Sequence, residues 1–263
     1  MTPEIADAVA GLMGVGREVL LVGFVVFLRV GGVMAVMPGF GEQVVPLRIR
    51  LGLALAFTLV TAPAVAPELA ALADRPGGLT RALITEPVAG LILGLALRLM
   101  AMALQMAGTM AANATSLAQF LGNAGVDPQP AMAQLLFVGG LALAMISGLH
   151  VQMAELLILS YGLMPAGDLP AGWMVAAWGS AQVARVFALA FSLAAPFVIA
   201  ALVYNMALGA INRAMPQLMV VFIGAPALTL GGLALLLVVA PVALAIWLQA
   251  LAGFFADPLA AGR

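Results

Sequence analysis

Residues 214–256, AMPQLMVVFIGAPALTLGGLALLLVVAPVALAIWLQALAGFFA, decide the fold of this chain. The stretch contains no charged residue. About 20 apolar residues in a helix cross the hydrocarbon layer of a membrane, and this run is roughly twice that length. Backbone groups in lipid must pair within the protein. The stretch therefore predicts long apolar helices rather than loops.

The start of this stretch carries polar residues that a simple membrane anchor would exclude. Asn212 and Arg213 precede it, and Pro216 and Pro226 lie inside it. We interpret NRAMPQLMVVFIGAP as the turn of a helical hairpin. Asn212 would cap or close the turn, and Arg213 would donate to carbonyls or to a partner. Pro216 would take an early helical position, where its missing N–H is not needed, and Pro226 would bend the returning helix.

The composition of the whole chain agrees with an apolar environment. Of the 263 residues, 65% are hydrophobic and 8% are charged, whereas soluble domains are about 25% charged. Such a surface must be covered by membrane lipid, by partner proteins or by both. The chain lacks the basic face of a nucleic-acid-binding protein, so no nucleic acid is expected as a partner.

The residue counts also limit the chemistry. There is no cysteine, which excludes disulfides, thiolate metal sites and a cysteine nucleophile. The single histidine excludes a multi-histidine metal site within one chain. No cofactor is expected. The start, MTPEIADAVAG, lacks the positive charge of a cleavable signal, and we expect it to be a retained lead-in to the first helix.

The apolar runs predict an all-α, polytopic membrane-type protein of about six long, partly bent helices, forming one domain over residues 1–263. No run alternates with the two-residue period of a barrel strand. The six predicted helices are 17–37, 48–66, 82–107, 131–160, 181–211 and 217–250. Turn-forming residues at 38–46, 66–78, 122–130 and 164–172 separate several of them. The arginines divide almost evenly between the two sides, so the positive-inside rule gives no orientation.

Several ionisable residues interrupt the apolar runs, and each should face a partner or water. They are Arg29, Glu86, Arg98, His150, Glu155 and Arg185. Glu86 and Arg98 are too far apart to pair on one helix, so we expect partners from other helices or chains. Residues close to a helix end, such as Arg185, could instead reach the membrane interface.

Two shorter patterns indicate packing and a pore. Gly90 and Gly94 in GLILG share a helical face and would let two helix backbones approach closely. The stretch 107–130 is polar although it is uncharged before Asp127. Polar residues at this depth favour an element that is buried in protein or lines a wet cavity. An ordinary loop is the alternative. Ser147 and His150 share a helical face, but no third catalytic group accompanies them, which argues against a hydrolase.

Four ordered stretches together resemble the FliR family of flagellar export proteins and its SctT relatives in virulence secretion. They are LRVGGVMAVMPGFGEQVVPLRIRLGLALAFTLVTAP at 28–63, Glu86 to Gly108, DPQP with GLHVQMAELLILSYGLMPAG at 127–167, and YNMALGAINRAMPQLMVVFIGAPALTLGG at 204–232. The resemblance covers essentially the whole chain. The residues that carry it, and that we expect in helix packing and assembly, are Arg29, Pro38, Gly41, Pro46, Arg50, Glu86, Gly90, Gly94, Arg98, His150, Asn212, Arg213, Pro216 and Pro226.

The resemblance implies a core subunit of the export gate, with helices paired as bent hairpins in a helical assembly. Such a subunit joins FliP-like and FliQ-like proteins in a channel for unfolded flagellar proteins across the bacterial inner membrane, at the flagellar basal body. FlhB-like and FlhA-like export proteins associate with it. The chain has no phosphate-binding loop or evident proton relay, so we predict a conduit component and no enzyme.

The resemblance also implies a plug at about 108–122. Thr109 stands where the family commonly has an acidic residue, and NATSLAQ replaces the usual methionine-glycine-leucine-serine run. The plug is therefore assigned by position and polarity. Its predicted residues are Gly108, Thr109, Asn113, Thr115, Ser116, Gln119, Phe120 and Gly122.

Three other functions stay open at this stage. A virulence secretion subunit fits the same motifs, although GLH at 148–150 looks more flagellar. A small-solute transporter would show internal repeats, which we do not see. A membrane protease would depend on Ser147 and His150.

Overall fold

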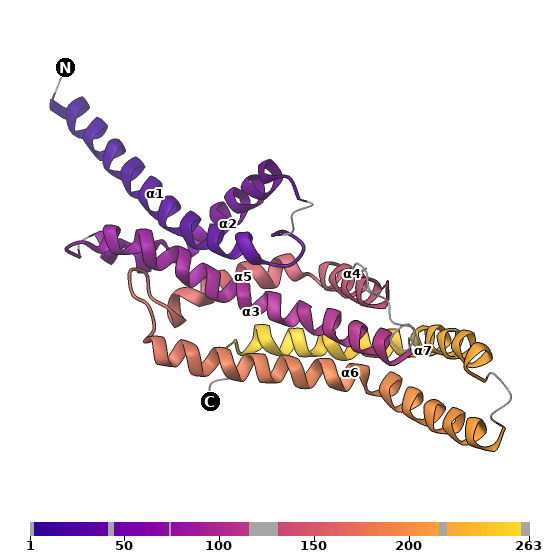
Figure 1. The fold of residues 1–263 in the computed structure, drawn as a ribbon. Helices are drawn as coiled ribbons and strands as arrows, with labels where there is room; N and C mark the ends of the chain where they lie inside the picture. Colours follow the sequence, from indigo (N-terminus) through magenta and orange to yellow (C-terminus); the bar gives the residue numbers. More distant parts are fainter. Residues whose placement is uncertain (1–2, 42–44, 74, 116–130, 216–219, 259–263) are drawn as a thin grey trace. The chain divides into compact units, whose positions relative to one another are not determined.

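The structure is a computed structural model that describes residues 3–41, 45–73, 75–115, 131–215 and 220–258. Within these residues every regular element is a helix, which confirms the all-α prediction. The helices are α1 Pro3–Val36, α2 Leu47–Ala73, α3 Gly78–Thr115, α4 Ala131–Ile146, α5 Leu149–Leu163, α6 Gly172–Ala214 and α7 Val220–Ala256 (Figure 1).

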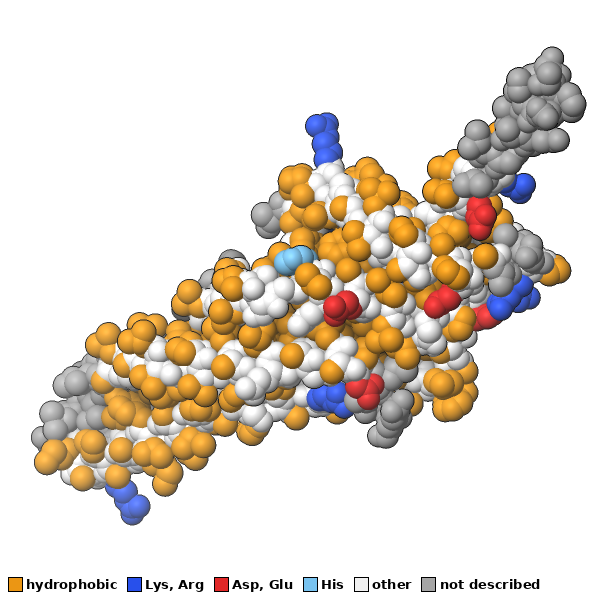
Figure 2. Space-filling view, turned by 180° about the vertical axis from the view of Figure 1, so that it is seen from behind, with side chains coloured by type: hydrophobic (Ala, Val, Ile, Leu, Met, Phe, Trp, Pro, Cys, Tyr) orange, Lys and Arg blue, Asp and Glu red, His pale blue; other side chains and the backbone are white. Residues whose placement is uncertain are grey.

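Five of the described helices are long and apolar enough to cross a membrane, and six segments qualify if α4 and α5 count as one broken span. Figure 2 shows one face of the molecule, where hydrophobic side chains predominate and charged side chains are few. Large exposed apolar residues occur along α1, α2, α6 and α7. The protein is therefore a polytopic membrane protein, as its composition predicted.

The predicted break at 66–78 is mostly wrong, because α2 continues to Ala73. It does so through Pro63 and Pro67. A proline inside a helix costs about 3 kcal/mol, but Val65, Leu69 and Leu72 are buried along the same segment. Each such buried side chain contributes about 1.5–3 kcal/mol. Burial therefore outweighs the two prolines, and the next helix begins only at Gly78.

The single helix predicted for 131–160 is also wrong. The helix breaks after Ile146 and resumes at Leu149. Gly148 has φ 87°, in the left-handed region, which a right-handed helix cannot contain. Ser147 and His150 consequently do not share a helical face. The premise of the hydrolase interpretation is removed.

The chain divides into two compact units. The first contains Met1–Arg98 and Gly148–Ala176, and the second contains Leu99–Ser147 and Ala177–Arg263. In the first unit α2 packs against α1 and α5, and the core includes Val26, Val30 and Val33 of α1.

In the second unit α4 packs against α7. The indole Nε1 of Trp247 donates to the Met100 carbonyl at 2.7 Å, which ties α7 to α3. Helices α6 and α7 follow each other as a hairpin, as predicted for 212–226, although residues 212–214 belong to α6 and 220–226 to α7. Figure 1 draws the two helices running back alongside one another. Trp178 Nε1 donates to the Pro258 carbonyl at 2.9 Å and so joins the start of α6 to the end of α7.

Candidate functional site

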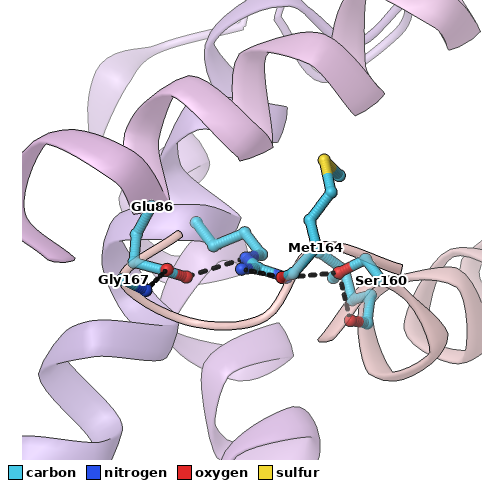
Figure 3. Close-up of polar contacts among 6 residues, drawn as sticks. Glu86, Ser160, Met164 and Gly167 are labelled. Atoms are coloured by element: carbon cyan, nitrogen blue, oxygen red, sulfur yellow. Dashed lines mark hydrogen bonds and ion pairs between the residues drawn. The ribbon is translucent and has the colours of Figure 1, made fainter. Parts of the chain in front are cut away.

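A buried cluster of polar groups surrounds Arg29, in the apolar interior of the first unit. Arg29 lies in α1 and is 0% exposed. Its Nε donates to Glu86 Oε2 of α3 at 2.8 Å, in an ion pair whose two side chains are both inaccessible to solvent. Its Nη1 donates to Ser160 Oγ of α5 at 3.0 Å, and its Nη2 donates to the Met164 carbonyl at 2.8 Å. One guanidinium therefore holds three helices together (Figure 3).

The partners of Arg29 are themselves satisfied. The second carboxylate oxygen of Glu86, Oε1, accepts from the Gly167 backbone N–H at 3.2 Å. The Ser160 hydroxyl donates to the Leu157 carbonyl at 2.6 Å. The guanidinium carbon of Arg29 lies 3.7 Å from the centre of the Tyr161 ring, in a cation–π contact. We call Arg29, Glu86, Ser160, Met164 and Gly167 the Arg29 cluster.

The Arg29 cluster joins three helices through buried polar contacts. A buried ion pair contributes little net stability by itself, but removing one partner leaves a buried charge and costs about 3–5 kcal/mol. Five donors in a planar fork make arginine suited to several partners at once. Among the described residues, no three His, Asp or Glu side chains come together as a metal ion would require. The contacts of the cluster link α1 to α3 and to α5.

Close packing of α1 against α3 brings the pair together. A side-chain Cβ added at Gly90 would overlap the Arg29 carbonyl oxygen, and one at Gly94 would lie 2.8 Å from the Val33 carbonyl oxygen. A Cβ at Gly32 would overlap the Pro87 carbonyl oxygen. The sequence singled out Gly90 and Gly94, and the structure places both against α1. It did not single out Gly32, whose only signal is its place three residues after Arg29.

Two further close approaches, in the second unit, lie at the end of α3 where the plug was predicted. A Cβ at Gly108 would overlap the Ala133 Cα of α4. A Cβ at Gly232 of α7 would lie 2.7 Å from Thr115 Cβ. The Thr109 hydroxyl donates to the Gln105 carbonyl at 2.8 Å, and the Thr115 hydroxyl donates to the Ala111 carbonyl at 2.9 Å, both within α3. These two hydroxyls are thus satisfied inside the helix.

The other predicted plug residues divide between exposed helix and undescribed chain. Asn113 lies on the exposed side of α3. Ser116, Gln119, Phe120 and Gly122 lie outside the described residues. The structure accordingly bears on the plug only up to Thr115.

Four predicted residues surround the connection between α1 and α2. Pro38 is buried, and the Gly41 N–H donates to the Met37 carbonyl at 2.7 Å. Pro46 stands just before α2, where its carbonyl accepts from Ile49 at 3.0 Å. Arg50 is half-buried in the first turn of α2. These residues lie at or beside the break predicted at 38–46, between the first two helices.

The remaining predicted residues lie at helix ends or outside the described part. Arg98 Nη1 donates to the Val36 carbonyl at 3.4 Å, at the C-terminus of α1, where a positive charge is favourable. Asn212 and Arg213 are exposed in the last turn of α6, and His150 is exposed near the start of α5. Pro216 lies outside the described residues, and Pro226 belongs to α7.

A known protein family matches the part of the chain that contains these contacts. Residues 20–254 match the profile of the family described as bacterial export proteins, family 1. The matched range contains the whole Arg29 cluster and the close approaches of both units. The chain belongs to this family.

The curated relatives of this family member carry one name. The flagellar biosynthetic protein FliR of Caulobacter vibrioides is 36% identical over 213 residues, which are 80% of this chain and 85% of the relative. FliR of Escherichia coli K12 is 28% identical, over 81% of this chain and 82% of the relative. FliR of Pectobacterium carotovorum is 29% identical, over 78% of this chain and 79% of the relative.

The match to the export-protein family confirms the resemblance to FliR. This member is a flagellar type III export component and is embedded in a membrane. The flagellar interpretation therefore replaces the virulence alternative.

Proposed function

We propose that this FliR-family protein is a core subunit of the flagellar export channel, through which unfolded flagellar proteins cross the inner membrane at the basal body. The observation that carries the proposal is how little of the long helices the chain buries by itself. In α7 only 17% of the most apolar window is buried, and in α6 33%. Surfaces this apolar and this open require lipid or other subunits.

Within that assembly the protein acts as a conduit, and its two units together form one export-gate domain. The partners are FliP-like and FliQ-like subunits in the channel, with FlhB-like and FlhA-like export proteins beside it. The Arg29 cluster supports this role because it holds three helices rigidly without offering a reacting group. Energy for transport then comes from other components, and this chain contributes packing, sealing and opening.

Co-purification tests the proposal directly. A strain that lacks this chain should lose flagellar export and motility, and the restored, affinity-tagged chain should bring FliP-like and FliQ-like proteins with it from detergent-solubilised membranes. Imaging of the particle should show helices of this chain in a closed ring around an axial channel. Full motility without the chain, or a particle that lacks both partners, would contradict the proposal.

The gate is a second testable part of this function. We propose that the segment at 108–122 closes the channel in the resting state. Deleting residues 116–122, which follow the last described turn of α3, should leave assembly intact and make cells permeable to ions that the intact channel excludes. The measurement is membrane conductance, or growth in media that report ion leakage. As a control, two exposed residues of α6, Gly209 and Ala210, are deleted instead. Unchanged permeability in an assembled channel would argue against a plug here.

A further inference from the structure

A pocket in the second unit carries polar groups for which protein export has no evident use. It has a volume of about 310 Å³ and lies between α3, α6 and α7. Its lining residues are Met100, Gln182, Arg185, Leu189, Ala250, Gly253 and Phe254. Most of the wall is thus apolar, and its polar side chains come from neighbouring turns of α6.

Gln182 is the buried polar group of this pocket. Its side chain is 0% exposed, yet neither Oε1 nor Nε2 has a hydrogen-bond partner among the described atoms. Buried amides are normally hydrogen-bonded, because an unsatisfied donor or acceptor loses its hydration without compensation. Gln182 therefore keeps, in the wall of the pocket, one donor group and one acceptor without a partner among the described atoms.

Arg185 adds a positive charge at the same place. It follows Gln182 by three residues, a spacing that puts both on one side of α6. Its side chain is exposed, in contrast to the buried amide. Among the described lining residues it is the only charged one. The combination of an arginine, an amide and apolar walls suits an anion that has an apolar part.

The position of the pocket along α6 suits a lipid headgroup. Trp178 lies one turn before Gln182 and is tied to Pro258, and α7 ends three residues after Gly253. Tryptophan is enriched where membrane helices meet the headgroup region, and arginine reaches the same level. Basic pockets between membrane helices commonly bind anionic lipid headgroups.

We propose that this pocket binds the headgroup of an anionic phospholipid. The phosphate oxygens accept from the Arg185 guanidinium and from Gln182 Nε2, and a headgroup hydroxyl donates to Gln182 Oε1. The first methylenes of an acyl chain contact Met100, Leu189 and Phe254. A glycerol headgroup fits these needs because it combines phosphate acceptors with hydroxyl donors. A carboxylate of a partner protein only accepts hydrogen bonds and would leave Gln182 Oε1 unsatisfied.

Native mass spectrometry of the full chain, delipidated in mild detergent with its co-purifying subunits, tests the proposal. The protein is titrated with dioleoyl-phosphatidylglycerol, with dioleoyl-phosphatidylcholine and with inorganic phosphate. Phosphatidylglycerol should bind more tightly than the other two. Gln182→Leu and Arg185→Gln should each weaken it about tenfold, since each removes one hydrogen bond to a charged group. Gln134→Leu on the exposed side of α4 and Arg81→Gln in α3 are matched controls and should bind as the wild type does.

Thermal melting separates lipid binding from misfolding. Gln182→Leu keeps a similar volume and removes two unsatisfied groups, so without lipid it should melt at or above the wild-type temperature. Phosphatidylglycerol should then raise the melting temperature of the wild type but not that of the variant. Equal phosphatidylglycerol affinity in Gln182→Leu and wild type would overturn the proposal. So would equal binding of phosphatidylcholine, equal competition by inorganic phosphate, or efficient cross-linking of a cysteine at position 182 to another subunit.

Discussion

Replacing Arg29 with methionine is expected to abolish flagellar export. The substitution keeps an unbranched apolar stem but leaves the Glu86 carboxylate buried without its cation, and it removes donors from Ser160 and the Met164 carbonyl. Breaking a buried pair in this way costs about 3–5 kcal/mol, which is a large share of the 5–15 kcal/mol that folded proteins typically have. Swimming in soft agar, secreted flagellin and the amount of this protein in the membrane all measure the effect.

The double variant shows whether the charge is responsible. Arg29→Met combined with Glu86→Gln removes both charges and keeps an acceptor for the Gly167 N–H, so it should melt at a higher temperature than Arg29→Met alone. Residues in direct contact couple by about 0.5–3 kcal/mol in such cycles. Arg81→Gln, at an exposed position in the first turn of α3, should be neutral. Wild-type export and melting temperature in Arg29→Met would show that the cluster does not hold the fold.

Lysine at position 29 is expected to rescue little. A lysine ammonium is a compact charge without the planar fork of arginine. It can pair with Glu86, but it cannot also reach Ser160 and the Met164 carbonyl in the geometry that the guanidinium has. The two substitutions together distinguish a need for charge from a need for three simultaneous contacts.

The sequence predicted the need for a partner at Arg29 but not the partner itself. A charge within an apolar run has to be compensated, and this requirement is local. Glu86 is 57 residues away, and which helices meet is decided by packing over the whole fold. Only two acidic residues, Glu86 and Glu155, lie well inside the predicted apolar runs. That small set was the available signal, and the burial of Glu86 decides between them.

The errors in the predicted helices have a common physical cause. Turn-forming residues predict that the second helix ends at residue 66, but apolar burial carries α2 through Pro63 and Pro67. The opposite error occurred at Gly148, where the apolar pattern continues while the backbone enters the left-handed region. Glycine is common in membrane helices, so a helix-breaking glycine looks the same in the sequence as one that packs.

Gly32 has no recognisable signal of close approach in the sequence, because such a signal is a spacing of small residues within one helix. The motif at Gly90 and Gly94 is visible as a four-residue spacing. Its complement lies on α1, and a single glycine there has no spacing of its own. Only the paired backbones show that Gly32 faces the Pro87 carbonyl and Gly90.

Adjacent glycines in α1 provide the sharpest test of that crossing. At Gly32 an added Cβ would overlap the Pro87 carbonyl oxygen and lie 3.1 Å from both Gly90 Cα and Leu91 N. All three are backbone atoms, which cannot turn aside, so Gly32→Ala should force α1 away from α3. At Gly31 an added Cβ meets nothing within 4 Å. Gly31→Ala should therefore be neutral or stabilise α1 by about 0.5–1 kcal/mol, because alanine loses less backbone entropy than glycine.

The two alanine variants should accordingly differ in sign. Overpacking of a well-packed interior costs about 1–3 kcal/mol, and here it also separates the backbones that carry Arg29 and Glu86. Gly32→Ala should lower the melting temperature of the purified protein and reduce export, while Gly31→Ala leaves both at or above the wild-type level. The two substitutions add the same methyl group at neighbouring positions of α1. The change in helix propensity is therefore the same in both variants and does not contribute to the difference between them. Equal behaviour of the pair would mean that the close approach of α1 and α3 is not required, whereas a clear difference assigns the cost to that contact.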